Sequence, residues 1–202
     1  MARSAFDNAQ FLAAARQLVI ERGPAMVTVD SVTQRLKAPK GSFYYRFASR
    51  DALLGELWLQ SAVAYQEGFM AAIDADDGLG AALHTPAWAR AHLDDACLLL
   101  LYSREDFVAG DWPSALRKGV REQAERVKDA LTRFARLAFG ATGSGQMRRA
   151  AFVLLEVPLA AVKPHLKRRE APPPLVDELI RSTFQAIAPR ADAGRARKST
   201  VA

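Results

Sequence analysis

The residue types best suited to chemistry in this chain gather in one short stretch, residues 40–46. Two phenylalanines one helical turn apart, Phe43 and Phe47, can anchor a helix there. The side chains left for its other faces are those of Lys40, Ser42, Tyr44, Tyr45 and Arg46. A short helix with hydroxyl, aromatic and basic groups outside suits the major groove of DNA. The stretch is therefore predicted to contact double-stranded DNA, although a lone tyrosine pair is more often an ordinary core or surface pair.

Catalysis has little support in the sequence. Cys97 lies beside a run of leucines, and we therefore expect it to be an inert structural thiol. The three histidines, His84, His92 and His165, lack the spacing of a metal site. There is also no glycine-rich phosphate loop and no nucleophile elbow. We therefore expect no enzyme, no cofactor and no metal.

Two short helices must position the DNA-contacting side chains. Thr28 can cap the first, residues 28–36, by accepting a hydrogen bond from a free first-turn N–H. The inward stripe of that helix is Val29, Val32 and Leu36. Pro39 opens the second helix, where a missing N–H costs little, and it breaks the helix before it. The pattern predicts a helix-turn-helix.

The stretch 28–47 resembles the N-terminal helix-turn-helix of the TetR family of bacterial transcriptional regulators. The matching or closely replaced positions are Thr28, Val29, Val32, Lys40, Gly41, Ser42, Phe43, Tyr44 and Phe47. The flanks, residues 11–23 and 49–54, resemble the family's first helix and the start of its fourth. Two departures bear on the angle of the recognition helix. Lys37 replaces the turn glycine, and Pro39 replaces a capping serine.

The resemblance implies an all-α fold of about nine helices in two domains. A three-helix DNA-binding domain would span residues 1–48, and a ligand-binding and dimerisation domain residues 49–189. Residues 190–202, small, basic and patternless, would be a disordered tail. The implied DNA-binding residues are Thr28, Lys37, Lys40, Gly41, Ser42, Tyr44, Tyr45 and Arg46. Tyr44 and Lys40 would touch phosphates, while Ser42 and Tyr45 would face the groove; Gly41 would allow close approach, of DNA or of a packed helix.

Composition and charge agree with a DNA-binding globular protein. The 202 residues are half hydrophobic and one quarter charged. Residues 1–50 hold eight basic and three acidic residues, a net +5 against +6 for the whole chain. This basic end suits phosphate binding, and a solvated face is the alternative. One cysteine, no signal-peptide core and no apolar run of about eighteen residues indicate a cytoplasmic protein with no membrane partner.

Hydrophobic periodicity and breakers predict the remaining helices. The expected ranges are residues 6–22, 49–74, 86–107, 112–139, 146–163 and 175–188, with a break at residues 74–80. Ser4 with Asp7 resembles a capping box for the first helix. The second long helix, 49–74, could act as a lever between the two domains. Pro158 is expected to kink the helix 146–163.

The resemblance also implies a small-molecule pocket and a dimer interface in the second domain. Candidate ligand-binding residues are Trp58, Tyr65, Trp88, His92, Leu99, Tyr102, Phe107, Trp112, Phe134 and Phe152, although core packing is the commoner role for each. The dimer candidates are Val153, Glu156, Val157, Ala160, Leu179, Ile180, Phe184 and Ile187, with an ordinary internal core as the alternative. Glu156 carries the one charge of an apolar segment, so it needs a partner or a cavity.

These observations predict a homodimeric repressor that binds a palindromic operator and is released by an unknown, small hydrophobic effector. The alternatives are an activator or ligand-independent DNA binder of the same fold, a helical small-molecule-binding protein with a vestigial head, and a non-specific basic nucleic-acid binder.

Overall fold

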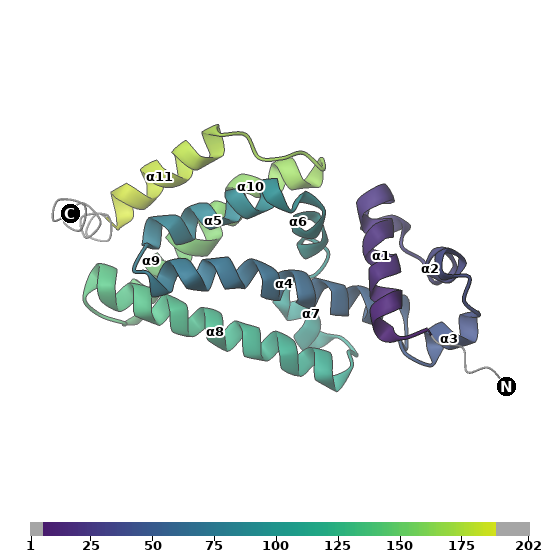
Figure 1. The fold of residues 1–202 in the computed structure, drawn as a ribbon. Coiled ribbons are helices and arrows are strands. Elements are labelled where there is room, and N and C mark those ends of the chain that lie inside the picture. The colour runs from purple at the N-terminus through teal and green to yellow at the C-terminus, as the bar shows by residue number, and fades with distance from the viewer. Residues whose placement is uncertain (1–5, 189–202) are drawn as a thin grey trace. The chain divides into compact units, whose positions relative to one another are not determined.

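The structure of the protein is a computed structural model that describes residues 6–188. Every regular element in this described part is helical (Figure 1), so the all-α prediction is confirmed. The first six helices are α1 (Asn8–Arg22), α2 (Val29–Leu36), α3 (Lys40–Tyr44), α4 (Arg50–Asp74), α5 (Gly78–Ala91) and α6 (Leu93–Leu99). The others are α7 (Arg104–Ala109), α8 (Ser114–Phe139), α9 (Ser144–Ala151), α10 (Val157–Lys167) and α11 (Leu175–Ile187), with a 3₁₀ turn at Pro24–Met26 and a π-helical turn at Phe152–Glu156.

The chain forms two compact units. The first combines the described residues up to Ala62 with Asp94–Val120, and the second combines Val63–Leu93 with the described residues from Arg121 onward. The long helices α4 and α8 each contribute residues to both units. The expected functional boundary between residues 48 and 49 stays a prediction, and the expected tail at 190–202 lies outside the described residues.

The core of the first unit forms around Phe11 of α1. Its ring packs edge-on against Phe43 at a centroid distance of 5.7 Å and against Phe47 at 6.1 Å. Both phenylalanines are buried, as their spacing predicts, and Val32 of α2 joins the same cluster. Burying these rings removes large apolar areas from water, which holds the short helices α2 and α3 against α1.

Capping explains where the helices of the first unit begin. Asp7 and Gln10 form the capping box of α1, with both hydrogen bonds at 2.8 Å. The expected pair, Ser4 with Asp7, is therefore wrong in its register, because Asp7 is the cap rather than its partner. Ser49 caps α4 as predicted, its Oγ accepting a hydrogen bond from the N–H of Ala52 at 3.1 Å.

The single helix expected at residues 86–107 is wrong. Asp77 caps α5 by accepting from the N–H of Gly80 at 2.8 Å, so this helix starts earlier and contains Pro86. It ends at Ala91 with His92 as the C-cap, and a separate capping box of Ser103 with Asp106 starts α7. Local caps thus divide a stretch that its hydrophobicity alone predicts to be one continuous helix.

In the second unit, α5 packs against α10 and α11. Arg90 of α5 donates to both carboxylate oxygens of Asp177, at 2.7 and 3.1 Å, and to the carbonyl of Pro172 at 3.2 Å. The helix expected at 146–163 is α9, the π-helical turn and α10 in sequence. Within that turn Val157 N–H bonds the carbonyl of Phe152, five residues back. This wider turn immediately precedes Pro158, which lacks an N–H and would crowd an α-helical carbonyl.

Candidate nucleic-acid interface and effector site

The turn between α2 and α3 is left-handed at Lys37, the residue that replaces the usual glycine. Lys37 adopts the left-handed conformation, with φ 52° and ψ 36°. Its N–H bonds the carbonyl of Gln34 at 3.1 Å, and the N–H of Ala38 bonds that of Thr33 at 2.9 Å. These hydrogen bonds cap the C-terminus of α2. They hold Lys37 in the left-handed conformation, which costs about 1 kcal/mol for a residue other than glycine.

Two capping arrangements place α2 and α3. Thr28 Oγ1 accepts from Ser31 N–H at 3.0 Å, and Ser31 Oγ accepts from Thr28 N–H at 2.9 Å. Pro39 gives α3 no side-chain cap, as its replacement of serine predicts. Ser42 Oγ instead donates to the Pro39 carbonyl at 2.6 Å, which ties the recognition helix to the turn.

The outer face of α3 is open to solvent. Tyr45 is 86% exposed and Tyr44 is 56% exposed, whereas Phe43 between α3 and α1 is fully buried. In the part of the chain that the structure describes, neither phenol has a hydrogen-bond partner. A Cβ built on Gly41 would meet nothing within 4 Å. An added Cβ at Gly41 would therefore not disturb the packing of the described residues.

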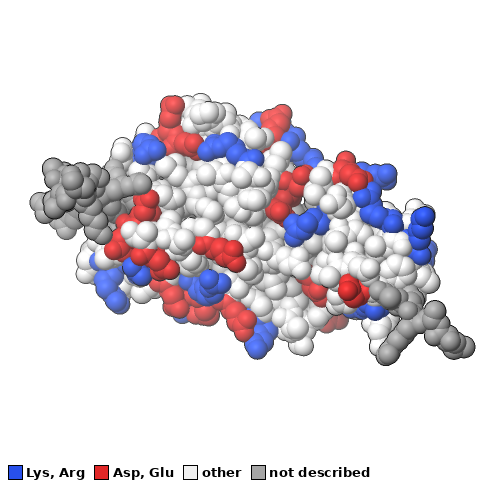
Figure 2. All heavy atoms as spheres, viewed as in Figure 1, with Lys and Arg blue, Asp and Glu red and all other residues white. Residues whose placement is uncertain are grey.

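The basic side chains at this candidate interface differ in whether they already interact with other groups of the chain. Lys40 forms an ion pair with Asp30 at 2.7 Å between Nζ and Oδ1, and the hydrogen bond to Asp30 raises the pKa of Lys40. Arg46 donates to the Ser42 carbonyl at 3.2 Å and lies 5.6 Å from the Tyr45 ring centroid. Lys37 has no ion-pair partner among the described residues. Figure 2 shows Lys and Arg side chains over α1 and α2, with acidic ones among them.

Asp30 and Arg50 have roles at this interface that were not expected from the sequence. Asp30 is ten residues from Lys40 and on another helix, so no spacing rule within one helix pairs them. Arg50 Nη2 donates to the Pro24 carbonyl at 3.1 Å, and its Nε donates to the Val27 carbonyl. Arg50 thus ties the first turn of α4 to the loop that enters α2. Its position directly after the capping Ser49 is the one signal that the sequence offers.

The expected effector residues fall into separate groups. In the first unit, Trp58, Tyr102, Phe107 and Trp112 form one aromatic cluster, with centroid distances from 4.7 to 5.6 Å. Trp58 Nε1 also donates to the Leu99 carbonyl at 3.2 Å. In the second unit Trp88 packs against both Tyr65 and His92, and Phe134 packs against Phe184. Phe152 is exposed.

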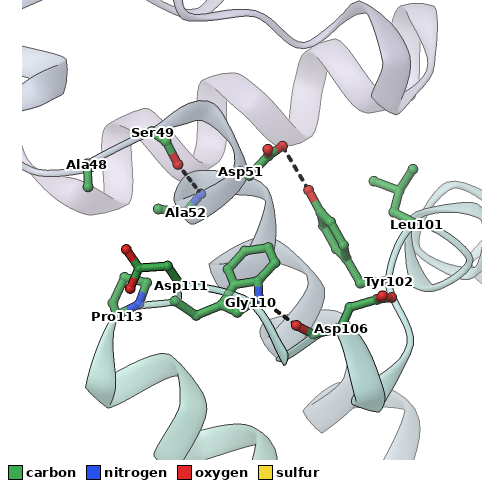
Figure 3. Close-up of a pocket in the computed structure, with 11 residues that line it drawn as sticks. Ala48, Ser49, Asp51, Ala52, Leu101, Tyr102, Asp106, Gly110, Asp111 and Pro113 are labelled. Carbon is green, nitrogen blue, oxygen red and sulfur yellow. Dashed lines mark hydrogen bonds between the residues drawn. The ribbon is translucent and has the colours of Figure 1, made fainter. Parts of the chain in front are cut away.

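A hollow of about 520 Å³ lies beside the aromatic cluster of the first unit (Figure 3). It is lined by the loop before α4 and the first turn of that helix, by residues 101 and 102, by α7, and by residues 110–113. Of the ten expected effector residues, Tyr102 and Trp112 line it. Its volume lies within the range of about 300–1,000 Å³ that is usual for small-molecule sites.

The expected dimer residues divide by burial. Val153, Ile180 and Phe184 are buried within the chain, so they have no surface left for a partner. Leu179 and Ala160 are exposed, while Glu156, Val157 and Ile187 are partly buried. Glu156 forms an ion pair with Arg148 of the same chain, which supplies the partner that its carboxylate needs.

Other kinds of site find no support in the described residues. No group of three or more His, Cys, Asp or Glu side chains among them could hold a metal ion. Within the same residues, no helix combines the length and the apolar character that crossing a membrane requires.

Comparison with known proteins assigns the fold and the N-terminal segment. The family model of the bacterial regulatory proteins, tetR family, matches residues 11–57, which contain most of α1, all of α2 and α3, and the start of α4. The crystal structure of a transcriptional regulator (TerR/AcrR family) from Aquifex aeolicus VF5 superposes with a TM-score of 0.56 at 17% identity, over 89% of this chain and 98% of that one. The curated proteins give no significant match. The resemblance seen in the sequence is therefore confirmed: residues 11–57 match the N-terminal model of the tetR family of bacterial regulatory proteins, and the chain shares the fold of the Aquifex structure.

Proposed function

We propose that the protein is a sequence-specific transcriptional regulator that places α3 in the major groove of DNA. The observation that carries this proposal is the outer face of α3. Tyr44 and Tyr45 are exposed there, and the space around Gly41 is open, while the buried Phe43 packs the helix against the core. The left-handed turn at Lys37 supports it, because the departure from glycine leaves the turn geometry intact. That geometry also argues against a vestigial head.

A second copy of the chain completes the proposed DNA-binding form. The large apolar side chains exposed on α10, α11 and the π-helical turn are those of Phe152, Leu159, Leu175 and Leu179. Leu175 and Leu179 lie one turn apart, so they form a stripe on α11. Pairing such stripes by a two-fold axis would present two recognition helices to one DNA duplex. The operator would then be a palindrome whose half-sites are about one helical turn, or slightly more, apart.

The proposed sign of regulation is repression relieved by a small molecule. An effector that binds the free protein more tightly than the DNA-bound protein must weaken DNA binding by the same factor. The aromatic cluster and its hollow in the first unit support the presence of such an effector. Titration of the protein with the cognate effector should therefore release the operator, and an operator affinity unchanged at saturation would contradict the proposal.

Selection of bound duplexes from a random DNA library, at near-physiological salt, tests the DNA-binding function. We expect a palindrome to be enriched. The matched control is Tyr44→Ala with Lys40→Ala, which should abolish the enrichment while the dimer persists in sedimentation. Retention of DNA without any enriched motif would contradict sequence-specific binding, and absence of retention would contradict DNA binding altogether.

A further inference from the structure

The hollow in the first unit has an aromatic wall that is held in place. The rings of Tyr102 and Trp112 pack edge to face at a centroid distance of 5.1 Å. The Trp112 Nε1–H donates to the Asp106 carbonyl at 2.8 Å (Figure 3). A Cβ on Gly110 would lie 2.4 Å from that nitrogen, and one on Gly55 would lie 2.9 Å from the indole ring. The absence of both side chains leaves the room in which the indole packs against α4 and the loop after α7.

The charged residues that line the hollow are all acidic. Asp51, Asp106 and Asp111 line the hollow, and none of the eleven lining residues is Lys or Arg. Arg50 pairs with Asp51 at 2.9 Å, which offsets one of the three charges. Asp106 accepts from the N–H of Ser103 at 2.6 Å and from its hydroxyl at 2.9 Å, and these bonds lower the pKa of Asp106. Asp111 has no ion-pair or hydrogen-bond partner in the described part of the chain.

The phenol of Tyr102 forms a hydrogen bond with one of these carboxylates. It donates to Asp51 Oδ1 at 3.0 Å. Burial, followed by the hydrogen bond to Asp51, raises the pKa of Tyr102 to about 12. Tyr102 therefore stays protonated and neutral at neutral pH, so it adds no charge to the hollow. Among the described residues, Asp106 and Asp111 have no ion-pair partner, whereas Asp51 pairs with Arg50.

We propose that this hollow binds a small organic cation, whose apolar groups pack on Tyr102 and Trp112 and whose positive centre lies among Asp51, Asp106 and Asp111. Aromatic faces attract cations, and an anionic, partly enclosed wall strengthens that attraction. An anion would meet uncompensated carboxylates, and a neutral apolar molecule would leave them without a charge partner. The chemistry of the wall thus selects the class of ligand.

The site adjoins the elements that hold the helix-turn-helix. Asp51 contacts Tyr102 on one side and Arg50 on the other, and Arg50 donates to the Pro24 and Val27 carbonyls ahead of α2. A cation that draws Asp51 toward the hollow competes with Arg50 for its carboxylate. This regulatory meaning rests on the proposed function, whereas cation binding itself does not.

Isothermal titration of the full chain with tetraphenylphosphonium tests the binding site, with triphenylphosphine oxide as a neutral molecule of similar shape. We expect saturable binding of one cation per chain and at least tenfold weaker binding of the oxide. The variant Asp111→Asn should weaken binding of the cation by about fivefold, because it removes one nearby carboxylate. The matched control is Asp129→Asn on α8, which removes the same charge outside the hollow and should leave the affinity unchanged.

Three results would overturn the site. They are no saturable binding of tetraphenylphosphonium, equal binding of the phosphine oxide, and equal effects of the Asp111 and Asp129 variants. The same cation is then added to the protein bound to its selected duplex. Loss of DNA supports the regulatory link through Asp51, and unchanged DNA affinity overturns it while the binding site stands. Failure of the protein to bind DNA at all would overturn the proposed function, and the titration would still decide the cation site.

Discussion

At the scale of single residues, a substitution at Gly41 should affect DNA binding without reducing the stability of the fold. Its position is exposed, and an added Cβ meets nothing in the chain. In a helix interior, alanine is favoured over glycine by up to about 1 kcal/mol. The variant Gly41→Ala should therefore melt at the same or a higher temperature. If the DNA backbone approaches this glycine, the same variant should lose about tenfold in operator affinity.

Thermal unfolding and fluorescence anisotropy of a labelled duplex measure the two effects of Gly41→Ala. The matched control is Gly145→Ala in α9, which also meets nothing within 4 Å and should change stability alone. Unchanged DNA affinity in Gly41→Ala would show that the DNA does not come close at this position.

Asp30 governs how much of the charge of Lys40 is available to phosphate. Both side chains are exposed, so solvent screens their ion pair at 2.7 Å and its contribution is small. The variant Asp30→Asn frees the ammonium and removes an anion from the interface. DNA affinity should rise by about twofold to fivefold, with a steeper dependence on salt. Anisotropy titrations over a range of salt concentrations measure both, with Asp129→Asn as the control for net charge. Weaker binding by Asp30→Asn would mean that the aspartate orients Lys40 rather than competing for it.

At the scale of elements, α4 and α5 meet closely at one glycine of the second unit. A Cβ on Gly68 would lie 2.3 Å from His84 Cε1, so the imidazole would have to move. That ring's Nε2 lies 2.8 Å from the Tyr65 carbonyl, and moving it breaks the hydrogen bond. Overpacking costs about 1–3 kcal/mol, which exceeds the gain in helix propensity of about 1 kcal/mol. We expect Gly68→Ala to destabilise the protein by about 1–2 kcal/mol in urea unfolding, while Gly145→Ala does not.

The same histidine predicts a loss of stability in mild acid. Burial lowers the pKa of His84 below its ordinary value of 6.5, against the opposing effect of the hydrogen bond to Tyr65. Below pH 6.5 the unfolded chain therefore binds more protons than the folded one. The stabilising contribution is present above pH 6.5 and is lost as the pH falls through the folded-state pKa. Urea unfolding from pH 7 to 5 should show a shallower decline in His84→Gln than in the wild type, and parallel declines would contradict this.

Local sequence signals predicted the helices well where caps and apolar spacing agree. Ser49 starts α4 and the Phe43–Phe47 pair buries α3, both as expected. The prediction failed for the helix at residues 86–107 because continuous hydrophobicity conceals local caps such as Ser103 with Asp106. Pro86 was taken as a start, yet it lies inside α5, where the cap at Asp77 has already begun the helix.

At the scale of the whole molecule, only part of the candidate site could be predicted from the sequence. The proposed DNA-binding residues lie within one continuous motif, so a pattern of residue types finds them. The acidic hollow combines segments near residues 50, 102, 106 and 112, and no spacing rule joins them. The two compact units are discontinuous in the chain for the same reason. Long-range packing, rather than local preference, decides these groupings.

The last prediction concerns assembly. Leu179 is 56% exposed on α11 and forms a stripe with Leu175, whereas its neighbour Ile180 is buried in the chain. A glutamate at position 179 would have to be desolvated in an apolar dimer interface, but it would be solvated in a monomer. The variant Leu179→Glu should therefore shift the protein toward monomers in sedimentation velocity while its thermal unfolding stays cooperative. It should also weaken operator binding by tenfold or more, because two half-sites would no longer be bound together. Arg181→Gln lowers the net charge by the same one unit at an exposed position on the opposite side of the helix, and it should leave the dimer intact. If both variants sedimented as the wild type does, the apolar stripe of α11 would not be the dimer interface, and a palindromic operator would need another explanation.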